Sequence, residues 1–229
     1  MIRPFQRRGK SHIAGAMPML RPLALAAALA LGLAACAGPE AEAPPADAAA
    51  TTAVTDSAWT LDPAGSRLAY VSIKAGEVAE TNRFATLSGG VGADGTATLS
   101  VDLASVDTGV EIRNERMREI FFAVAENPAA TVTARLDPAR FAGLAVGQSV
   151  TRPLTASVTI KGVSSDVGTE VLVTRVAEDR VLVVPTAPVI VSTDMFGLTD
   201  ELGELRALAQ LPSITPAVPV TFTLAFRRG

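Results

Sequence analysis

The sequence predicts an all-β domain, an antiparallel barrel of about eight strands with one or two short helices. Three observations predict this class. Apolar and polar residues alternate with a period of two, not 3.6, over several segments. Glycine-containing turns separate these segments, and most segments have one apolar and one polar face, as antiparallel sheets do. A two-sheet sandwich would show the same alternation. We favour the barrel because closing the sheet leaves no open edge.

Eight segments have the pattern of strands. In TATLSVDL, the side chains of Ala97, Leu99 and Val101 share one face, and threonine, serine and aspartate share the other. LTASVTIK and VPVTFTLAF repeat this alternation. The predicted strands cover residues 96–103, 154–161 and 218–226, with weaker candidates at 67–74, 81–88, 130–136, 170–176 and 181–191. We expect turns at Gly89-Gly90, Ala93-Asp94-Gly95 and Lys161-Gly162.

Two segments have helical spacing instead. In residues 110–122, Val110, Arg113 and Met117 recur at intervals of three to four, while most of the charged residues face elsewhere. In TDELGELRALAQL, residues 199–211, leucines recur along one side, and Thr199 or Asp200 is the expected N-cap. These segments are the two predicted short helices.

The first 35 residues have the pattern of a lipoprotein signal peptide. Five basic residues accompany an apolar run, LALAAALALGLAA, which is shorter than the roughly 20 residues of a membrane span. The run ends in LAAC, which resembles the bacterial lipobox, whose cysteine (here Cys36) carries acyl chains such as palmitate. An ordinary secretory signal that happens to contain a cysteine is the alternative. Met1, Met17 and Met19 each provide a start for such a signal.

We therefore expect three parts: a signal peptide at residues 1–35, a flexible tether at 36–57 and the barrel domain at 58–229. The tether is rich in alanine, proline and acidic residues and has almost nothing to bury. Acylated Cys36 would anchor the protein on the periplasmic face of a bacterial envelope. Ala37, where aspartate would signal retention, favours the outer membrane by the enterobacterial sorting rule.

The composition of the predicted domain excludes several classes of function. Without the leader, 15 of the 20 basic residues remain against 23 acidic ones, which excludes nucleic acid as a partner. The only histidine, His12, and the only cysteine, Cys36, precede the domain, so no triad or zinc site can form from them. We predict no enzyme activity, metal or cofactor. A hydrolase would have to pair carboxylates among Asp107, Glu111, Asp194 and Glu201.

Binding is the remaining class. A barrel of about eight strands has room for one slender ligand, although side chains fill many small barrels. Several of the few aromatic residues lie outside the strands, at Phe121, Phe122 and Phe196, where they would form a barrel mouth. This favours a hollow barrel over a filled one that serves as an envelope interaction module. Self-association into a homodimer stays open.

Three blocks, in this order, resemble the YceI-like family of lipocalin-like, polyisoprenoid-binding proteins. They are SVDTGVEIRNERMREIFFAVAENPAATVTA, LTASVTIKGVSSDV and VSTDMFGL. The resemblance implies a lipocalin-like barrel with a helical excursion near its rim, in an exported protein whose lumen holds a long isoprenoid or an isoprenoid quinone tail. Many members have Asp-x-His-Leu after the first arginine. Here Arg113 is followed by Asn114, Glu115, Arg116 and Met117, so a head-group contact through that histidine is in doubt.

These arguments together predict a ligand site beside the first helix. Arg113 or Asn114, with Arg116 as a further candidate, would meet a polar or anionic head group. An ion pair of Arg113 with Asp107 or Glu111 is the structural alternative. The residues expected to enclose the apolar chain are Phe84, Met117, Phe121, Phe122, Phe196 and Phe222.

Overall fold

The computed structural model describes residues 58–228. The predicted signal peptide, the lipid-attachment residue Cys36 and the tether to residue 57 lie outside the described residues. Within the described part of the chain, none of the helices has the length and apolar character needed to cross a membrane.

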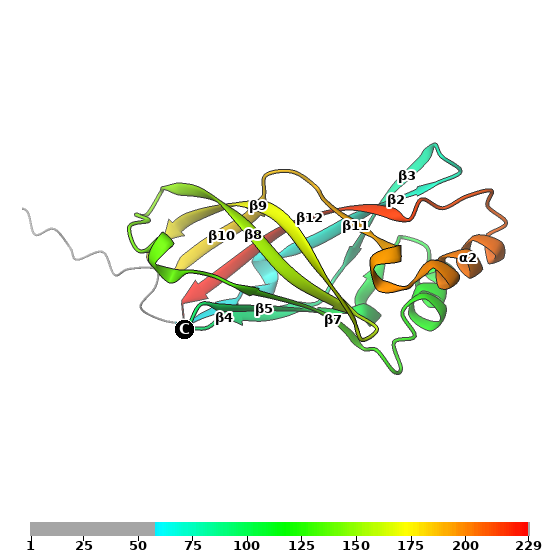
Figure 1. Ribbon diagram of the computed structural model, residues 1–229, viewed down its shortest axis with the longest axis horizontal. Coiled ribbons are helices and arrows are strands. Elements are labelled where there is room, and N and C mark those ends of the chain that lie inside the picture. The colour runs from blue at the N-terminus through cyan, green and yellow to red at the C-terminus, as the bar shows by residue number, and fades with distance from the viewer. Residues whose placement is uncertain (1–57, 229) are drawn as a thin grey trace, which may run out of the picture. The chain divides into compact units, whose positions relative to one another are not determined.

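The strands form a closed antiparallel barrel (Figure 1). Its eight-membered ring runs β1-β4-β5-β7-β8-β9-β10-β12 and closes where Trp59 pairs with Arg228 and Leu61 with Phe226. The barrel prediction is therefore confirmed over the sandwich. The ring strands are β1 Trp59–Leu61, β4 Leu87–Val91, β5 Thr96–Asp102, β7 Ala129–Arg135, β8 Ser149–Ile160, β9 Val163–Ala177, β10 Arg180–Pro185 and β12 Ala217–Arg228.

Four further strands extend this ring toward one end. They are β2 Arg67–Lys74, β3 Val78–Phe84, β6 Val106–Asp107 and β11 Val189–Ser192. The long strand β12 connects the two halves, because its second half pairs with β10 and β1 and its first half with β11 and β2. Strands β10 and β11 are thus two parts of one interrupted strand, and so are β1 and β2.

Interrupted strands explain two errors of the sequence prediction. The predicted single strands at 81–88 and 181–191 are each two strands, β3 and β4, and β10 and β11. A bend at Ala85 and Thr86 lets β3 pair with β2 while β4 pairs with β1. The short β1 lacks enough residues for any alternation to be recognised.

The predicted turn at Gly89-Gly90 is wrong, because both glycines lie inside β4. A Cβ on Gly89 would lie 2.2 Å from the Thr98 carbonyl oxygen, and one on Gly90 would lie 2.5 Å from the Trp59 oxygen. Glycine is required here because the neighbouring strands approach too closely for a side chain. The Lys161-Gly162 turn is confirmed: it joins β8 to β9, with φ of 49° and 77° at its two residues.

The two predicted helices are present, and both lie at one end of the barrel, opposite the end at which β12 finishes (Figure 1). Helix α1, Glu111–Arg116, continues into a π-helical turn, Met117–Phe121. Helix α2 covers Thr199–Leu208. The N-cap prediction is wrong, since Leu198 occupies that position and the Thr199 hydroxyl donates to Asp194 Oδ1 at 2.9 Å. Four 3₁₀ turns complete the fold: Pro63–Gly65, Leu103–Ser105, Pro138–Phe141 and Thr193–Phe196.

The helices are held to the barrel by apolar contacts. Phe121, Phe122, Phe196 and Leu198 are all buried and belong to the same core cluster as the inward-facing residues of the strands. Leu202 of α2 packs against this cluster. Burial of these side chains closes the core at the helical end.

Candidate ligand-binding cavity

A cavity of about 700 Å³, partly open to the outside, lies in the barrel beside the helices. Its wall is formed by the inward faces of strands on every side and by side chains of α1, the π-helical turn and α2. Most of the residues that border it are apolar, among them Leu99, Val132, Ala156 and Val158. The volume lies within the range of pockets for small organic ligands, about 300–1,000 Å³.

Seven of the eight residues predicted to bind a ligand border this cavity. They are Phe84, Arg113, Met117, Phe121, Phe122, Phe196 and Phe222. The eighth, Asn114, does not border it. A contact of any of them with a ligand stays a prediction, but the structure brings residues of β3, α1, the π-helical turn, the 3₁₀ turn at Thr193–Phe196 and β12 to one place.

Aromatic rings form a continuous row beside the cavity. The ring centroids of Tyr70 and Phe84 are 5.6 Å apart, and those of Phe84 and Phe122 are 5.9 Å apart. Phe121 and Phe122 meet edge to face at 4.9 Å. Such pairs stabilise one another by about 0.5–1.5 kcal/mol beyond their burial. The π-helical turn makes this arrangement, because it directs consecutive phenylalanines into the same core.

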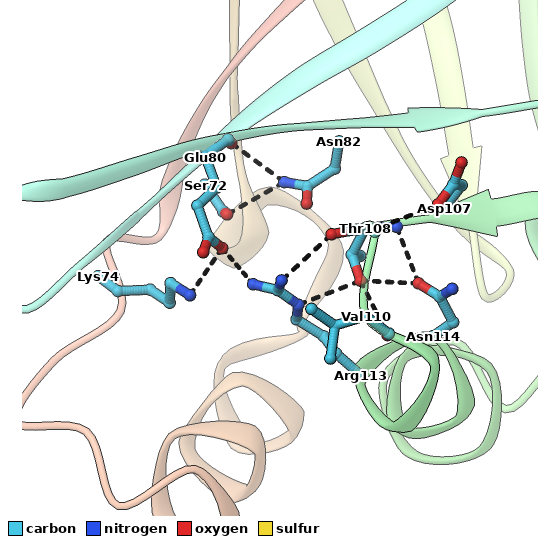
Figure 2. A network of polar contacts seen from close by, with 10 residues as sticks. Ser72, Lys74, Glu80, Asn82, Asp107, Thr108, Val110, Arg113 and Asn114 are labelled. Atoms are coloured by element: carbon cyan, nitrogen blue, oxygen red, sulfur yellow. Dashed lines mark hydrogen bonds and ion pairs between the residues drawn. The ribbon is translucent and has the colours of Figure 1, made fainter.

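One side of the cavity is polar (Figure 2). We call this side the polar wall; its members are Tyr70, Ser72, Lys74, Glu80, Asn82, Thr108 and Arg113. They come from β2, from β3, from the segment that leads into α1 and from α1 itself, at the end of the barrel where the helices lie. The opposite strands, β7 and β8, contribute only apolar residues to the same cavity.

Arg113 is the centre of this wall. Its guanidinium forms an ion pair with Glu80 and donates to the Thr108 hydroxyl and carbonyl oxygens, each at 3.1 Å. Lys74 holds the same Glu80 carboxylate at 2.6 Å. Figure 2 shows Lys74 and Arg113 approaching Glu80 together. Arg113 thus fastens α1 to β3.

The ion-pair partners expected for Arg113 were wrong. Asp107 pairs with Arg83 at 2.6 Å, and Glu111 pairs with Arg118 at 2.6 Å. The actual partner, Glu80, precedes Arg113 by 33 residues and lies on another element. The pairing of β3 with β2 and β6 brings Glu80 close to Arg113. A local sequence pattern does not predict this pairing.

Asn114 has a structural position. Its side chain is buried, and its Oδ1 accepts from the Thr108 backbone N–H at 2.8 Å and from the Thr108 hydroxyl at 2.7 Å. Its amide group donates to Glu111 at 3.3 Å. These bonds hold the loop that precedes α1 against the helix.

The surroundings of the polar wall shift the pKa of two of its residues, Glu80 and Tyr70. Hydrogen bonds from Lys74 and then Arg113 lower the pKa of Glu80, so the carboxylate is charged at neutral pH. Burial raises the pKa of Tyr70, while the positive charge of Arg113 acts in the opposite direction. Tyr70 is therefore a neutral phenol, and its hydroxyl has no hydrogen-bond partner among residues 58–228. It is available to a ligand as donor or acceptor.

Three of the four carboxylates considered for a hydrolase are held in the charged form by partners of their own. The pKa of Asp107 is lowered by the Gly109 N–H and Arg83, that of Glu111 by Arg118, and that of Glu201 by Lys161. A general acid needs the opposite shift. Asp194 accepts from Thr199 on another segment. Residues 58–228 contain no group of three or more potential metal ligands.

Several cavity residues were not predicted from the sequence. Every second residue of β2 from Tyr70 on faces the cavity, namely Tyr70, Ser72 and Lys74. Because this face of the strand becomes polar toward its end, the sequence pattern predicts that it faces solvent. The inward residues of β8 were recognised as one apolar face, without evidence that the space between them and the other strands is empty.

Fold and cavity together define a class: a closed lipocalin-like barrel with an internal apolar cavity and one polar wall. Residues 59–226 match the YceI-like domain model, and the chain belongs to the YceI-like domain family. A structure of a polyisoprenoid-binding domain from Saccharophagus degradans, implicated in plant cell wall breakdown, is 38% identical, with a TM-score of 0.74. That alignment covers 76% of this chain and 99% of the other.

A second similar structure supports the fold alone. Burkholderia cenocepacia BcnA is 20% identical, with a TM-score of 0.55, over 72% of this chain and 98% of the other. No curated protein shows significant similarity to the chain.

Proposed function

We propose that this chain binds a long isoprenoid-type lipid, or the tail of an isoprenoid quinone, inside the barrel and serves as its carrier or sequestering protein. The observation that carries the proposal is the apolar cavity of about 700 Å³. The 38% identical domain from Saccharophagus degradans, described as polyisoprenoid binding, supports the ligand class.

The size and chemistry of the cavity suit one prenyl chain. At about 30 Å³ for each non-hydrogen atom, the share of one water in the liquid, 700 Å³ holds on the order of 20 atoms, or about four isoprene units. An apolar chain gains about 25 cal/mol for each Å² it removes from water. A branched hydrocarbon with one polar end fits a cavity whose lining is mostly apolar and carries its ion-paired residues on one side.

The polar wall sets the orientation of the ligand. The polar end lies near Tyr70, whose hydroxyl is available, and the hydrocarbon extends away from β2 toward β8. Glu80 pairs with both Arg113 and Lys74 and offsets one of their two positive charges, so the wall suits a head group that accepts hydrogen bonds, such as a quinone or an alcohol. The function is non-enzymatic, because binding alone uses these groups.

An envelope interaction module with a filled barrel is the competing proposal. It requires side chains to occupy the lumen, whereas here alanines and valines leave the lumen open. The hollow barrel therefore favours the lipid-binding proposal. Formation of a homodimer is compatible with either function.

We further propose that acylated Cys36 anchors the protein to the outer membrane, facing the periplasm. The lipobox-like LAAC and the following Ala37 support this. Cells expressing the full chain and its Cys36→Ser variant would be labelled with radioactive palmitate and fractionated. Label in the wild type and release of the unlabelled variant into the soluble fraction are expected, whereas membrane retention of an unlabelled variant would contradict the anchor.

The binding proposal is tested by filling the cavity. Val132 of β7 points into it, and the adjacent Thr131 is exposed on the outer face. Purified wild type, Val132→Trp and Thr131→Trp would be incubated with farnesol, and the lipid that co-elutes in gel filtration would be quantified by mass spectrometry. We expect Val132→Trp to lose at least tenfold in affinity and Thr131→Trp to bind as the wild type does. Equal binding by both variants would refute a luminal site.

A further inference from the structure

The barrel contains a second, smaller cavity of about 400 Å³. It lies toward the end formed by β1, β4 and the second half of β12, away from the helices. Val171, Val173 and Val181 form much of its wall, and Trp59 and Phe226 also border it. The segment that follows β7 covers it, through Leu136, Pro138 and Phe141.

The two cavities follow one another along the same strands. Three strands pass from one cavity to the other in a single inward step: Leu99 to Ala97 on β5, Val132 to Ala134 on β7 and Thr169 to Val171 on β9. On β12 the step is longer, because the buried Leu224 lies between Phe222 of the first cavity and Phe226 of the second. On β8, Leu154 borders both cavities, and it is the one residue among 58–228 that does so. Leu154 therefore stands at the boundary between them.

Small side chains surround this boundary. Ala97 pairs with Ala134 across β5 and β7, and Ala134 pairs with Ala156 across β7 and β8. Three neighbouring strands thus carry only a methyl group at this level. Leu154 is the large inward side chain on this side of the barrel, and a leucine changes rotamer without breaking a hydrogen bond.

We infer that the second cavity receives the distal end of a prenyl chain whose polar end lies at the polar wall, and that Leu154 is a gate that selects for chain length. This inference rests on the proposed lipid-binding function. Continuity with the main cavity identifies the occupant, because a chain that fills the first cavity meets Leu154 and the alanines next. The lining of the second cavity is largely apolar. Of the four charged residues that border it, Arg135, Asp137 and Arg140 lie at its exposed edge, and the half-buried Arg152 of β8 donates to the Thr151 and Arg140 carbonyl oxygens.

Volume sets the expected selectivity. By the same measure of about 30 Å³ for each atom, 400 Å³ admits about 13 further atoms, or two to three isoprene units. Farnesol, with three units, fits the first cavity alone. Heptaprenol, with seven units, needs both. If about 13 atoms of the ligand can no longer enter the second cavity, the affinity should fall by a factor on the order of a hundred.

The test fills only the second cavity. Ala134→Phe places a ring there, and Thr133→Phe places the same ring on the exposed outer face one residue away. Affinities of the full chain for farnesol and heptaprenol would be measured by co-elution. We expect Ala134→Phe to bind farnesol within threefold of the wild type and heptaprenol about a hundredfold more weakly. Thr133→Phe should leave both affinities unchanged.

Two outcomes separate this inference from the proposed function. If wild type binds neither prenol, the lipid-binding function fails. If wild type binds both and Ala134→Phe binds heptaprenol as tightly as wild type does, the second cavity is not a chain site and only the inference fails. Leu154→Phe, which narrows the boundary at a different residue, should show the same selective loss of heptaprenol. It provides an independent result if Ala134→Phe does not fold.

Discussion

Arg113 either contacts a ligand or holds helix α1 to the barrel, and one substitution distinguishes these two roles. Arg113→Ala removes an ion pair to Glu80 and two hydrogen bonds to Thr108. The Arg113 side chain is 27% exposed, so its ion pair is worth at most about 1 kcal/mol. The bonds to Thr108 add about 0.5–1.5 kcal/mol together, since a charged donor strengthens them and water replaces part of the loss. Glu80 keeps Lys74, so no carboxylate is left without a partner.

We therefore expect Arg113→Ala to lower the free energy of unfolding by about 2 kcal/mol. For a domain of this size that corresponds to a fall in melting temperature of about 4–8 °C. Urea unfolding followed by circular dichroism gives the free energy, and farnesol co-elution gives the affinity, which should change less than threefold. Arg116→Ala is the matched control, because Arg116 also borders the cavity but makes one long bond, 3.4 Å to the Leu208 carbonyl. It should cost less than about 0.5 kcal/mol.

The opposite pattern would refute this reasoning. If Arg113→Ala unfolds within about 0.5 kcal/mol of the wild type and binds farnesol tenfold more weakly, Arg113 is a ligand contact and its bonds to β3 are incidental. A double-mutant cycle with Glu80→Ala would then show no coupling energy in the unfolding data, where we expect about 1 kcal/mol.

Four further predictions follow from the same structure. Because the folded pKa of Glu80 is lowered, its stabilising effect is present above about pH 4.5 and lost as the pH falls through the folded value; urea midpoints at about pH 7 and pH 3 should differ less for Glu80→Gln than for wild type. Gly90→Ala should cost about 1–3 kcal/mol from its clash across the sheet, while Gly168→Ala, with open space around it, should cost under about 0.5 kcal/mol; equal costs would contradict the close approach. Phe122→Ala should cost about 3 kcal/mol in urea unfolding, and a cost below about 1 kcal/mol would show that the aromatic row is not part of the core. Tyr70→Phe should weaken farnesol about fivefold in co-elution and leave the hydrocarbon farnesene unchanged, and equal effects would exclude a hydrogen bond from its hydroxyl.

Much of the fold could be predicted from local patterns. Strands β5, β8 and β12 were recognised because each has one face toward the lumen, and a period of two is visible within a single segment. The bends that divide β3 from β4 and β10 from β11 were not recognised, because they depend on which neighbouring strand each half pairs with. Gly89 and Gly90 were misread for the same reason, since close contact between strands is invisible in one strand.

The sequence predicted many of the residues that border the site, but it did not predict the contacts between them. Phe121, Phe122 and Phe196 were chosen because aromatic residues are few in this chain and these lie outside the predicted strands, and Arg113 because it lies beside them in the block that resembles the family. The structure places them around one cavity. The partner of Arg113 and the exposure of Tyr70 to the lumen depend on pairing between distant segments. A hollow and a filled barrel have the same alternation, so neither cavity could be derived from the sequence.

The helical segment at residues 110–122 contributes both to the polar wall and to the apolar core. Its charges form ion pairs that hold α1 to β3 and to its own later turn. Its two phenylalanines enter the core beside the cavity. The segment is thus the part of the chain that joins the polar wall to the apolar lumen.

Organic extraction of the purified wild-type protein, followed by mass spectrometry, tests the central claim most directly. The Val132→Trp variant, purified from the same cells, provides the background. The lipid-binding account predicts a prenyl lipid or isoprenoid quinone in the wild-type extract, near one molecule for each protein, and its absence from the variant. A wild type that carries no such lipid, and that takes up neither farnesol nor heptaprenol afterwards, would contradict it.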